Sequence, residues 1–393
     1  MWFVFVGVGL TLVIAAGIYT RRRLATSMTE LGVRPRWVRV MRWASAWLLF
    51  GYPVIVIVTI AISLGLGAET LPRFEGKLLS WLLGVPFIWA VLVLVQSLPW
   101  LFVAEVAGLV LGERGKRVRA IAIVGVVTLF ALYTPIRIAI EHGDVRVRHH
   151  VVGSGSGLPF RIAFVADVQQ DVHTDEDVVA PVIATINRSA SDVVISGGDW
   201  INSGPDHIAD AARTAGALKS RLGTFSVRGD HEHFAYIDRE RSVREVDQAL
   251  AANGVQLIDN QVRWFTHEGK RIGVLFLNYN YIVRTKLDMV ASLVATLEPA
   301  DYSIVVTHQL DRPLAALLEG KVDLVLGAHT HGGQINPVVG VLHVPLARLE
   351  TTFVDGRYQL GTTDVIVTAG IGMSLVPIRY ASPGSLELIE LRL

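Results

Sequence analysis

The 393-residue chain contains no cysteine. Disulfide bonds, thiolate metal ligands and cysteine nucleophiles are therefore excluded, whereas the compartment stays open, because a protein without thiols works in oxidising and reducing surroundings alike. A strong charge of either sign is also missing, since the formal net charge is +1 at pH 7. Nothing in this balance indicates nucleic acid, so the sequence predicts no such partner.

Apolar residues are abundant and make up 51% of the chain. They concentrate in four long N-terminal stretches: Trp2 to Thr20, Ala44 to Leu66, Leu79 to Leu111 and Ala120 to Ile140. Each is long enough to cross a hydrocarbon core of about 30 Å as a helix that rises about 1.5 Å per residue. Residues 1–140 are therefore predicted to form a transmembrane region of about four helices, with the lipid bilayer as a partner.

The third stretch is longer than one crossing needs and contains Pro86 and Pro99, so we expect it to be tilted, kinked or partly interfacial. It also contains Glu105, and an intramembrane carboxylate is by default a functional candidate. Because Glu105 lies near one end of the stretch, a side chain that reaches the lipid headgroups is the favoured interpretation.

The loops between these stretches differ in their basic residues. The first and third loops carry Arg21, Arg22, Arg23, Arg34, Arg36, Arg39, Arg42, Arg114, Lys116, Arg117 and Arg119, whereas the second carries Arg73 and Lys77. Because basic loops stay in the cytoplasm, the first and third loops are predicted to be cytoplasmic. Four crossings then predict a multi-pass cell-membrane protein whose chain after Ile140 is extracytoplasmic. Two crossings by the third stretch would reverse this orientation.

The C-terminal part has the pattern of an α/β domain. Residues 141–157 are polar and end in "GSGSG", which predicts a flexible linker before a domain at 158–393. The predicted strands are Arg161–Ala166, Asp192–Ser196, Thr224–Val227, Arg271–Leu277, Tyr302–Thr307, Asp323–Leu326 and Val365–Thr368. The predicted helices include Val178–Ser189, Ile208–Arg221, Val243–Ala252 and Leu287–Leu297. In such folds we expect chemistry just past the strand ends.

Five of these strand ends are followed by acids or imidazoles. "ADVQ" supplies Asp167 and Gln169, "SGGDW" Asp199, "RGDHE" Asp230, His231 and Glu232, "VTHQ" His308, and "GAHTHGGQ" His329 and His331. One such motif alone is more often a turn or a cap, but five in the same topological place, with glycines that allow close backbone approach, indicate a shared site. Oxygen and nitrogen ligands without sulfur suit Mn²⁺, Fe or Zn²⁺.

These motifs resemble those of calcineurin-like metallophosphoesterases, in particular a bacterial membrane-associated branch with D-x-H, G-D, G-N-H-[DE], H and G-H-T-H-G-G-Q. The resemblance covers residues 158–393 and includes "VDGRYQLG" and "TAGIGMSLVPIRY". It implies a four-layered α/β/β/α sandwich around two divalent metal ions, and a metal-dependent hydrolase of phosphoric esters.

The resemblance also implies a role for each motif residue. The first metal would be held by Asp167, Gln169, Asp199 and His331, and the second by Asp199, Asp230, His308 and His329. His231 would protonate the leaving group or bind the phosphate, and Glu232 would orient it. The two ions would hold a hydroxide for in-line attack on phosphorus.

Two residues depart from the family pattern. Gln169 stands at the family's histidine position, and a neutral amide is a weak ligand, so we expect a looser first metal, a different metal there, or a single tightly bound ion. Gln170, Asp171 and His173 follow closely, and one of them is an alternative ligand. Asp230 stands at the family's asparagine position, where its charge should tighten the second metal.

The resulting expectation is a membrane-anchored phosphoesterase that acts on a phosphodiester or a pyrophosphate, with lipid-linked substrates favoured by location. The alternative is a phosphate-binding or scaffold membrane protein whose degenerate site has one metal or none and no turnover. A transporter coupled to hydrolysis is disfavoured, because no internal repeat is present. Arg379 in "PIRY" is a candidate phosphate contact, although a structural pairing is favoured. Oligomeric state and the choice between monoester and diester stay open.

Overall fold

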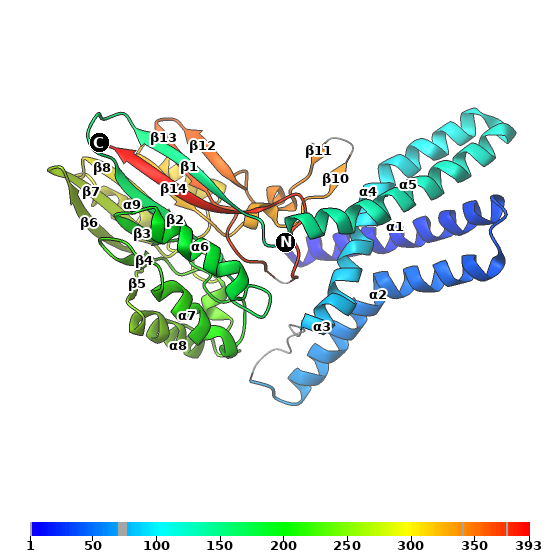
Figure 1. Ribbon diagram of the computed structural model, residues 1–393, viewed down its shortest axis with the longest axis horizontal. Helices are drawn as coiled ribbons and strands as arrows, with labels where there is room; N and C mark the ends of the chain where they lie inside the picture. The colour runs from blue at the N-terminus through cyan, green and yellow to red at the C-terminus, as the bar shows by residue number, and fades with distance from the viewer. Residues whose placement is uncertain (1, 70–76, 340–341, 375) are drawn as a thin grey trace. The chain divides into compact units, whose positions relative to one another are not determined.

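Figure 1 shows the computed structural model of the chain, which describes residues 2–69, 77–339, 342–374 and 376–393, with the side chains of 2–10, 113, 114 and 339 left undescribed. The chain divides into a helical unit and an α/β unit. The helical unit comprises Met1–Leu66, Pro72–Ile140 and Pro337–Val344, and the α/β unit Gly67–Leu71, Glu141–Asn336 and Pro345–Leu393.

The helical unit consists mainly of long apolar helices. Its helices are α1 (Trp2–Glu30), α2 (Pro35–Gly65), α3 (Lys77–Leu79), α4 (Val85–Val110) and α5 (Gly112–Glu141), and the π-helical segment η1 (Ser80–Gly84) joins α3 to α4. Among the described residues, three helical stretches are long and apolar enough to cross a membrane: Pro35–Gly65, Lys77–Val110 and Gly115–Glu141. A crossing by α1 stays a prediction.

The third apolar stretch forms one helical run from Lys77 to Val110. Its π-helical segment η1 ends just before Pro86, whose ring cannot donate a backbone hydrogen bond, and π-turns commonly absorb such a defect. Pro99 lies inside α4 without ending it. The run therefore fits one crossing rather than two. Arg73, which entered the orientation argument, lies outside the described residues.

Glu105 of α4 has polar partners within the helical unit. Arg23 of α1 donates through Nε and Nη2 to both carboxylate oxygens. The Tyr19 hydroxyl donates to the same carboxylate at 3.4 Å, and Nη1 of Arg119 lies 3.8 Å from it. These contacts connect α1, α4 and α5 through charge pairs, so the intramembrane candidate is an ion-pair partner. Its contact with headgroups stays a prediction.

The α/β unit contains two six-stranded sheets. The first has the order β1 (Val145–Gly153), β14 (Gly384–Arg392), β2 (Phe160–Val165), β3 (Val193–Ser196), β4 (Thr224–Ser226) and β5 (Val255–Leu257). The second has the order β12 (Gly356–Leu360), β13 (Thr363–Val367), β9 (Leu324–Gly327), β8 (Tyr302–Thr307), β7 (Lys270–Leu277) and β6 (Gln261–His267). The helices of this unit are α6 (Glu176–Arg188), α7 (Ile208–Gly216), α8 (Arg239–Ala252), α9 (Leu287–Ala295) and α10 (Arg312–Leu318).

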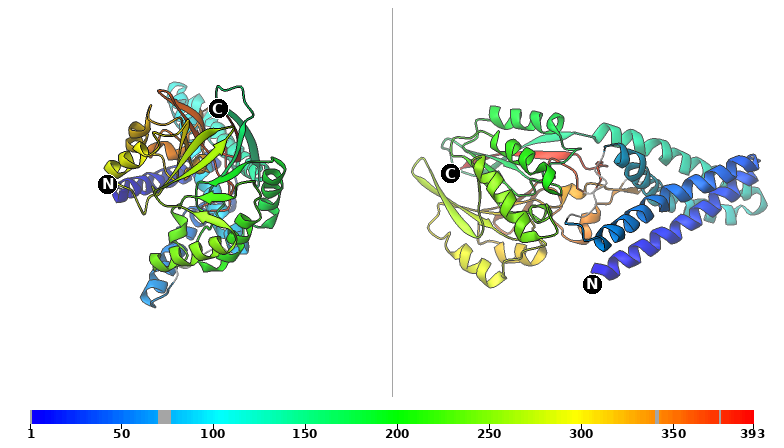
Figure 2. Two further views of the ribbon diagram at one scale, coloured as in Figure 1. Left: turned by 90° about the vertical axis from the view of Figure 1, so that its left-hand side faces the viewer. Right: turned by 90° about the horizontal axis from the view of Figure 1, so that it is seen from below.

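Three apolar layers hold these elements together. The central layer lies between the sheets and includes Phe164 and Ile195 of the first sheet and Val274 and Ile304 of the second. A second layer packs α6, α7 and α8 against the first sheet, and a third packs α9 and α10 against the second. The green and yellow helices accordingly lie on opposite sides of the strands (Figure 2). The predicted four-layered α/β/β/α sandwich is confirmed.

The strand directions bring the motif loops to one edge. β2, β3 and β4 pair in parallel, and so do β7, β8 and β9. Their residues are almost entirely buried, which explains the continuous β-branched runs in the sequence. Because parallel strands end at the same edge of a sheet, the loops that follow them lie together.

The segment 141–157 differs from the predicted flexible linker. Its residues Val145–Gly153 form β1, which pairs in parallel with β14 over its whole length. His150 lies 2.7 Å through Nε2 from the buried carboxylate of Glu387 on β14. The segment alternates polar and apolar residues because one of its faces meets solvent, and its partner strand is distant in the sequence. It is therefore part of the α/β unit.

Candidate metal centre

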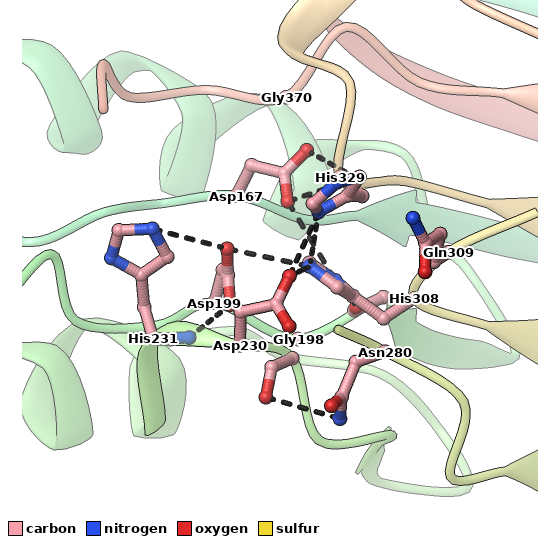
Figure 3. Close-up of polar contacts among 12 residues, drawn as sticks. Asp167, Gly198, Asp199, Asp230, His231, Asn280, His308, Gln309, His329 and Gly370 are labelled. Atoms are coloured by element: carbon pink, nitrogen blue, oxygen red, sulfur yellow. Dashed lines mark hydrogen bonds and ion pairs between the residues drawn. The ribbon is translucent and has the colours of Figure 1, made fainter. Parts of the chain in front are cut away.

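Five loops contribute to a polar cluster at this edge (Figure 3). Asp167 and Gln169 follow β2, Asp199 follows β3, Asp230 follows β4, His308 follows β8, and His329 and His331 follow β9. All seven residues predicted as metal ligands are thereby brought together. Six of them are buried, and the His329 side chain is 14% exposed.

The cluster consists of two groups of three donors. Asp230, His308 and His329 form one group, and Asp167, Asp199 and His331 form the other, with the ligand atoms of each group within 4.8 Å of one another. Asp199 approaches both groups, because its Oδ2 lies 3.4 Å from Nε2 of His308. This is the arrangement expected when one carboxylate is shared between two sites.

Unpartnered atoms in the cluster fit a bound cation. Oε1 of Gln169 and Nδ1 of His331 are buried, and neither has a hydrogen-bond partner among the described residues. Oδ2 of Asp230 is buried too, and its close neighbours are imidazole nitrogens of His308 and His329. A buried polar atom without a partner costs about 1–3 kcal/mol, so such atoms are expected where an ion binds. The carboxylate, imidazole and amide donors suit Mn²⁺, Fe or Zn²⁺.

The backbone of the cluster is strained at its predicted ligands. Asp167, Gln169, Asp199, His329 and His331 have φ values of 50°, 50°, 59°, 77° and 50°. Residues with a Cβ rarely adopt this left-handed region, at a cost of about 1–3 kcal/mol each, and such residues concentrate at functional sites. Five of the seven predicted ligands share this feature.

Two glycines allow the loops to approach closely. A Cβ on Gly229 would lie 2.1 Å from Oδ1 of Asp199, and a Cβ on Gly370 would lie 2.5 Å from Cβ of Asp167. Gly370 also has a φ of 67°. Both positions require glycine, because a side chain there would displace a predicted ligand.

The pKa values of the cluster's carboxylates and imidazoles are shifted in different directions. Burial raises the pKa of Asp167 to about 6 and lowers the pKa of His331 well below its ordinary value, so His331 stays neutral. Burial alone would also lower the pKa of His329, but hydrogen bonds with Asp230 and Glu350 outweigh it and raise the pKa to about 9. The pKa of His308 is likewise raised, because Asp199 and Asp230 outweigh its burial. Without an ion, protons on these imidazoles offset the carboxylate charge.

His231 points toward the cluster (Figure 3). Its Nδ1 is hydrogen-bonded to the backbone carbonyl of Asn202, and its Nε2 lies 4.0 Å from Oδ2 of Asp199 and 3.4 Å from the Ser374 hydroxyl. A carbonyl can only accept, so Nδ1 carries a hydrogen and Nε2 faces the site. The imidazole is therefore fixed by a backbone group.

The Glu232 carboxylate is hydrogen-bonded to the backbone of two loops. It accepts hydrogen bonds from the backbone N–H groups of Gly229, Asp199 and Trp200, at 2.7, 3.1 and 2.6 Å. Burial raises its pKa to about 7. Glu232 belongs to the 3₁₀ turn η3 (His231–His233), and its role in orienting His231 stays a prediction. Through these hydrogen bonds, Glu232 connects the loop after β3 to the loop after β4.

The alternative ligands near Gln169 serve the local loop. The Gln170 amide donates to the backbone carbonyl of Thr174. The Asp171 carboxylate accepts from the backbone of His173 at 2.7 Å and from the Asn202 amide at 2.7 Å. Neither residue belongs to the two donor groups found among the described residues, and the same holds for His173. Of these candidates, Gln169 is the one whose side chain lies beside Asp199.

Arg379 is buried and donates to backbone carbonyls. Its acceptors are His331, Ala369, Gly370, Gly372 and Ser382. This pattern agrees with the favoured structural role. Arg379 connects the loops that carry His331 and Gly370, rather than offering its guanidinium to a phosphate.

Three residues at the centre were missed in the sequence. Asn280, after β7, donates to the carbonyls of Arg228 and Gly229. The Tyr281 backbone donates to Oδ1 of Asp230 at 2.6 Å, and Oε1 of Glu350 lies 3.3 Å from Nε2 of His329. "NYN" at the end of β7 was a polar strand end like the other five and could have been noticed. Glu350 follows the 3₁₀ turn η5 (Leu346–Leu349), and no local pattern marks it.

Two adjacent groups of buried carboxylates and imidazoles at the edge of an α/β/β/α sandwich are the kind of donor set that metal-dependent phosphoric ester hydrolases use. Residues 160–333 match the family model described as calcineurin-like phosphoesterase. The chain accordingly carries a calcineurin-like metallophosphoesterase domain.

Curated relatives have the same class of domain. The chain is 27% identical over 239 residues to an uncharacterized metallophosphoesterase of Helicobacter pylori strain J99, covering 59% of each chain. It is 24% identical over 242 residues to a transmembrane protein with metallophosphoesterase domain of Danio rerio, covering 59% of this chain and 53% of the relative. The match thus spans about three fifths of the length of the first of these relatives and about half of the second.

Solved structures resemble the chain more weakly. A putative 5'-nucleotidase from Staphylococcus aureus is 14% identical with a TM-score of 0.36, covering 59% of this chain and 55% of that chain.

Proposed function

We propose that this chain is a membrane-anchored phosphoesterase that hydrolyses a phosphodiester or a pyrophosphate with the help of two divalent cations. The observation that carries this proposal is the approach of Asp199 to both donor groups, which suits two ions that share one carboxylate. The apolar helices long enough to cross a membrane support the anchoring.

The aspartates of the donor groups and His231 have different proposed roles. When bound, the cations supply a hydroxide nucleophile and neutralise the phosphate oxygens. Asp167, Asp199 and Asp230 supply the negative charge that holds the ions. His231, whose Nδ1–H is held by the carbonyl of Asn202, presents Nε2 to the leaving oxygen and in its imidazolium form transfers the Nε2 proton to it.

The test of this proposal is hydrolysis of bis(p-nitrophenyl) phosphate by the purified full-length chain in detergent with added Mn²⁺ or Zn²⁺. We expect metal-stimulated turnover that Asp199→Asn lowers by about 10³-fold or more, because the shared carboxylate is lost. Asp288→Asn, which changes an exposed aspartate at the start of α9, is the matched control and should leave turnover unchanged. Equal rates for the two variants would refute the proposal.

The proposed substrate is lipid-linked, and the apolar rim of the site supports this choice. We define this rim as Phe234, Tyr281 and the two exposed leucines of η5, Leu346 and Leu349, whose exposed fractions are 37%, 45%, 55% and 86%. The Phe234 ring lies 5.2 Å from that of His231, and the Tyr281 ring lies 4.9 Å from that of His329. Leu349 precedes Glu350 in the chain. Exposed apolar residues beside a polar centre fit a phosphate with an apolar tail.

A pair of leucine variants tests the lipid linkage. Leu349→Ser should lower kcat/KM for a detergent-dispersed lipid phosphodiester by about 10-fold and leave hydrolysis of the soluble aryl phosphodiester unchanged, because about 1–2 kcal/mol of apolar contact is lost. Leu158→Ser changes a leucine that is 70% exposed at the amino end of β2, away from the strand ends that carry the site, and should affect neither substrate. Equal loss on both substrates would exclude the rim as a lipid contact.

The proposed location is a cell membrane crossed several times, with the phosphoesterase domain outside the cytoplasm. The support is the asymmetry of basic loop residues and the single helical run Lys77–Val110. A reporter fused after Leu393 that is active only outside the cytoplasm is the expected result. Cytoplasmic activity of that reporter would reverse the orientation.

The second candidate function is phosphate binding without turnover. Gln169 favours it, because its side-chain nitrogen rather than its oxygen faces Asp199, at 2.7 Å. This function predicts no hydrolysis with any divalent cation, so the experiment on Asp199 separates the two candidates.

A further inference from the structure

We propose that Glu350 is a positioning residue that fixes the His329 imidazole so that Nδ1 is the atom offered to the second metal. Glu350 lies outside the five strand-end motifs and follows the 3₁₀ turn η5. The inference depends on a cation at the site, as in the proposed function, but not on turnover.

The two nitrogens of His329 face different surroundings. Nδ1 lies 2.9 Å from Oδ2 of Asp230 and 3.2 Å from Nε2 of His308, the other members of its donor group. Nε2 lies on the other side of the ring, 3.3 Å from Oε1 of Glu350. One nitrogen therefore points into the donor group and the other points at a carboxylate outside it.

A neutral imidazole carries one N–H, and only the bare nitrogen binds a metal. The Glu350 carboxylate can only accept a hydrogen bond when ionised, so it favours the tautomer with the hydrogen on Nε2. That tautomer leaves Nδ1 free for the ion. A carboxylate behind a metal-bound histidine also makes the imidazole a stronger ligand.

Glu350 is itself held in place. The Gln309 amide donates to Oε1 of Glu350, and the Tyr281 hydroxyl is a further hydrogen-bond partner of the same carboxylate. Tyr281 also reaches the donor group, because its backbone N–H donates to Oδ1 of Asp230. The carboxylate is therefore oriented by two side chains before any ion arrives, which keeps the entropy cost of its bond to His329 low.

The other imidazoles of the cluster differ in whether a hydrogen-bond acceptor lies behind the ring. Nδ1 of His308 is 2.7 Å from the backbone carbonyl of Gly197, which fixes its Nε2 toward the same donor group. Nδ1 of His331, in the other group, has no hydrogen-bond partner among the described residues. Both histidines of the second site thus have an acceptor behind the ring, and Glu350 supplies the one that does not come from the backbone.

The test measures Mn²⁺ affinity of the metal-free full-length chain by competition with a fluorescent chelator. Glu350→Gln should weaken the tightest Mn²⁺ site by about 10–100-fold, the usual effect of losing a carboxylate behind a metal-bound histidine. Glu350→Asp, which keeps the charge, should recover part of this loss. Glu319→Gln removes an exposed glutamate at the end of α10 and should bind Mn²⁺ like the wild type. The melting temperature of the metal-free Glu350→Gln variant should match that of the wild type.

Two results would overturn the inference. One is wild-type Mn²⁺ affinity in Glu350→Gln. The other is a weakened affinity that Glu350→Asp does not improve and that comes with a lower melting temperature of the metal-free protein, which would make the role structural. Weaker Mn²⁺ binding by Glu350→Gln in a wild type that hydrolyses no ester would support this inference while refuting the proposed activity.

Discussion

The side-chain nitrogen of Gln169 donates a hydrogen bond to Oδ2 of Asp199 across 2.7 Å. The family resemblance predicts a histidine at this position. In this chain the Gln169 amide donates a hydrogen bond to the carboxylate of Asp199. Oε1 of Gln169 has no hydrogen-bond partner among the described residues. We therefore expect the first site to bind its ion more weakly than the second.

Gln169→His should strengthen the first site. An imidazole replaces a neutral amide as ligand, so we expect the purified protein to retain about one more equivalent of Mn²⁺ or Zn²⁺ and to turn over faster. Elemental analysis after gel filtration measures the metal. Gln359→His, on an exposed position of β12, is the control for adventitious binding by an added histidine. Equal metal content in the wild type and Gln169→His would contradict this prediction.

Metal affinity should fall as the pH falls. The pKa of His329 is raised to about 9, so below that pH an ion must displace a proton from it. Affinity should therefore drop by at least about tenfold per pH unit between pH 9 and 6, since His308 also has a raised pKa. Below about pH 6 the buried Asp167 is protonated as well, which steepens the loss. Chelator competition at several pH values measures this, and an affinity that is flat from pH 6 to 8 would rule it out.

His231 and Glu232 should behave differently although they are adjacent. His231→Asn removes a proton donor, so turnover should fall by about 10²–10⁴-fold with unchanged metal content. Glu232→Gln weakens a carboxylate that accepts three backbone hydrogen bonds, so the free energy of unfolding should fall by about 1.5–3 kcal/mol. Kinetics and denaturant titration of both variants provide the measurements. Similar stability losses in the two would show that the assigned roles are wrong.

Gly229→Ala should disable the site without unfolding the domain. The added methyl group would lie 2.1 Å from Oδ1 of Asp199 and must push that carboxylate aside. A displacement of about 1 Å costs about 100-fold in rate, so we expect at least this loss of turnover. Gly327→Ala at the end of β9 would meet its neighbours at ordinary distances of 3.5 Å or more, and should keep most of the activity. Turnover of Gly229→Ala near the wild-type rate would contradict the close approach.

The central strands could be predicted from the sequence because their burial leaves a local pattern. β8 begins and ends where its apolar run does, at Tyr302 and Thr307. β1 could not be predicted, because its alternating charged residues resemble a solvated link and its hydrogen-bond partner β14 lies near the other end of the chain. A strand of this kind is defined by its partner rather than by its own residues.

The cluster at the strand ends was predictable for the same reason that it forms. Parallel strands bring their following residues to one edge, so motifs far apart in the sequence indicate one place. Side-chain direction was not predictable, and Glu232 shows this, because its carboxylate accepts a hydrogen bond from the backbone of Trp200. Glu350 was missed because it belongs to no strand end.

The left-handed backbone conformation lowers stability at five predicted ligands. These are Asp167, Gln169, Asp199, His329 and His331. Glycine at any of these positions would relax the chain, yet it would delete a donor atom from the centre. A selection for heat resistance alone would therefore enrich glycine at these five positions and would retain variants that lack activity. Both stability and the donor atoms of the centre therefore constrain these five positions. A homologue with glycine at one of them is expected to be more stable but inactive.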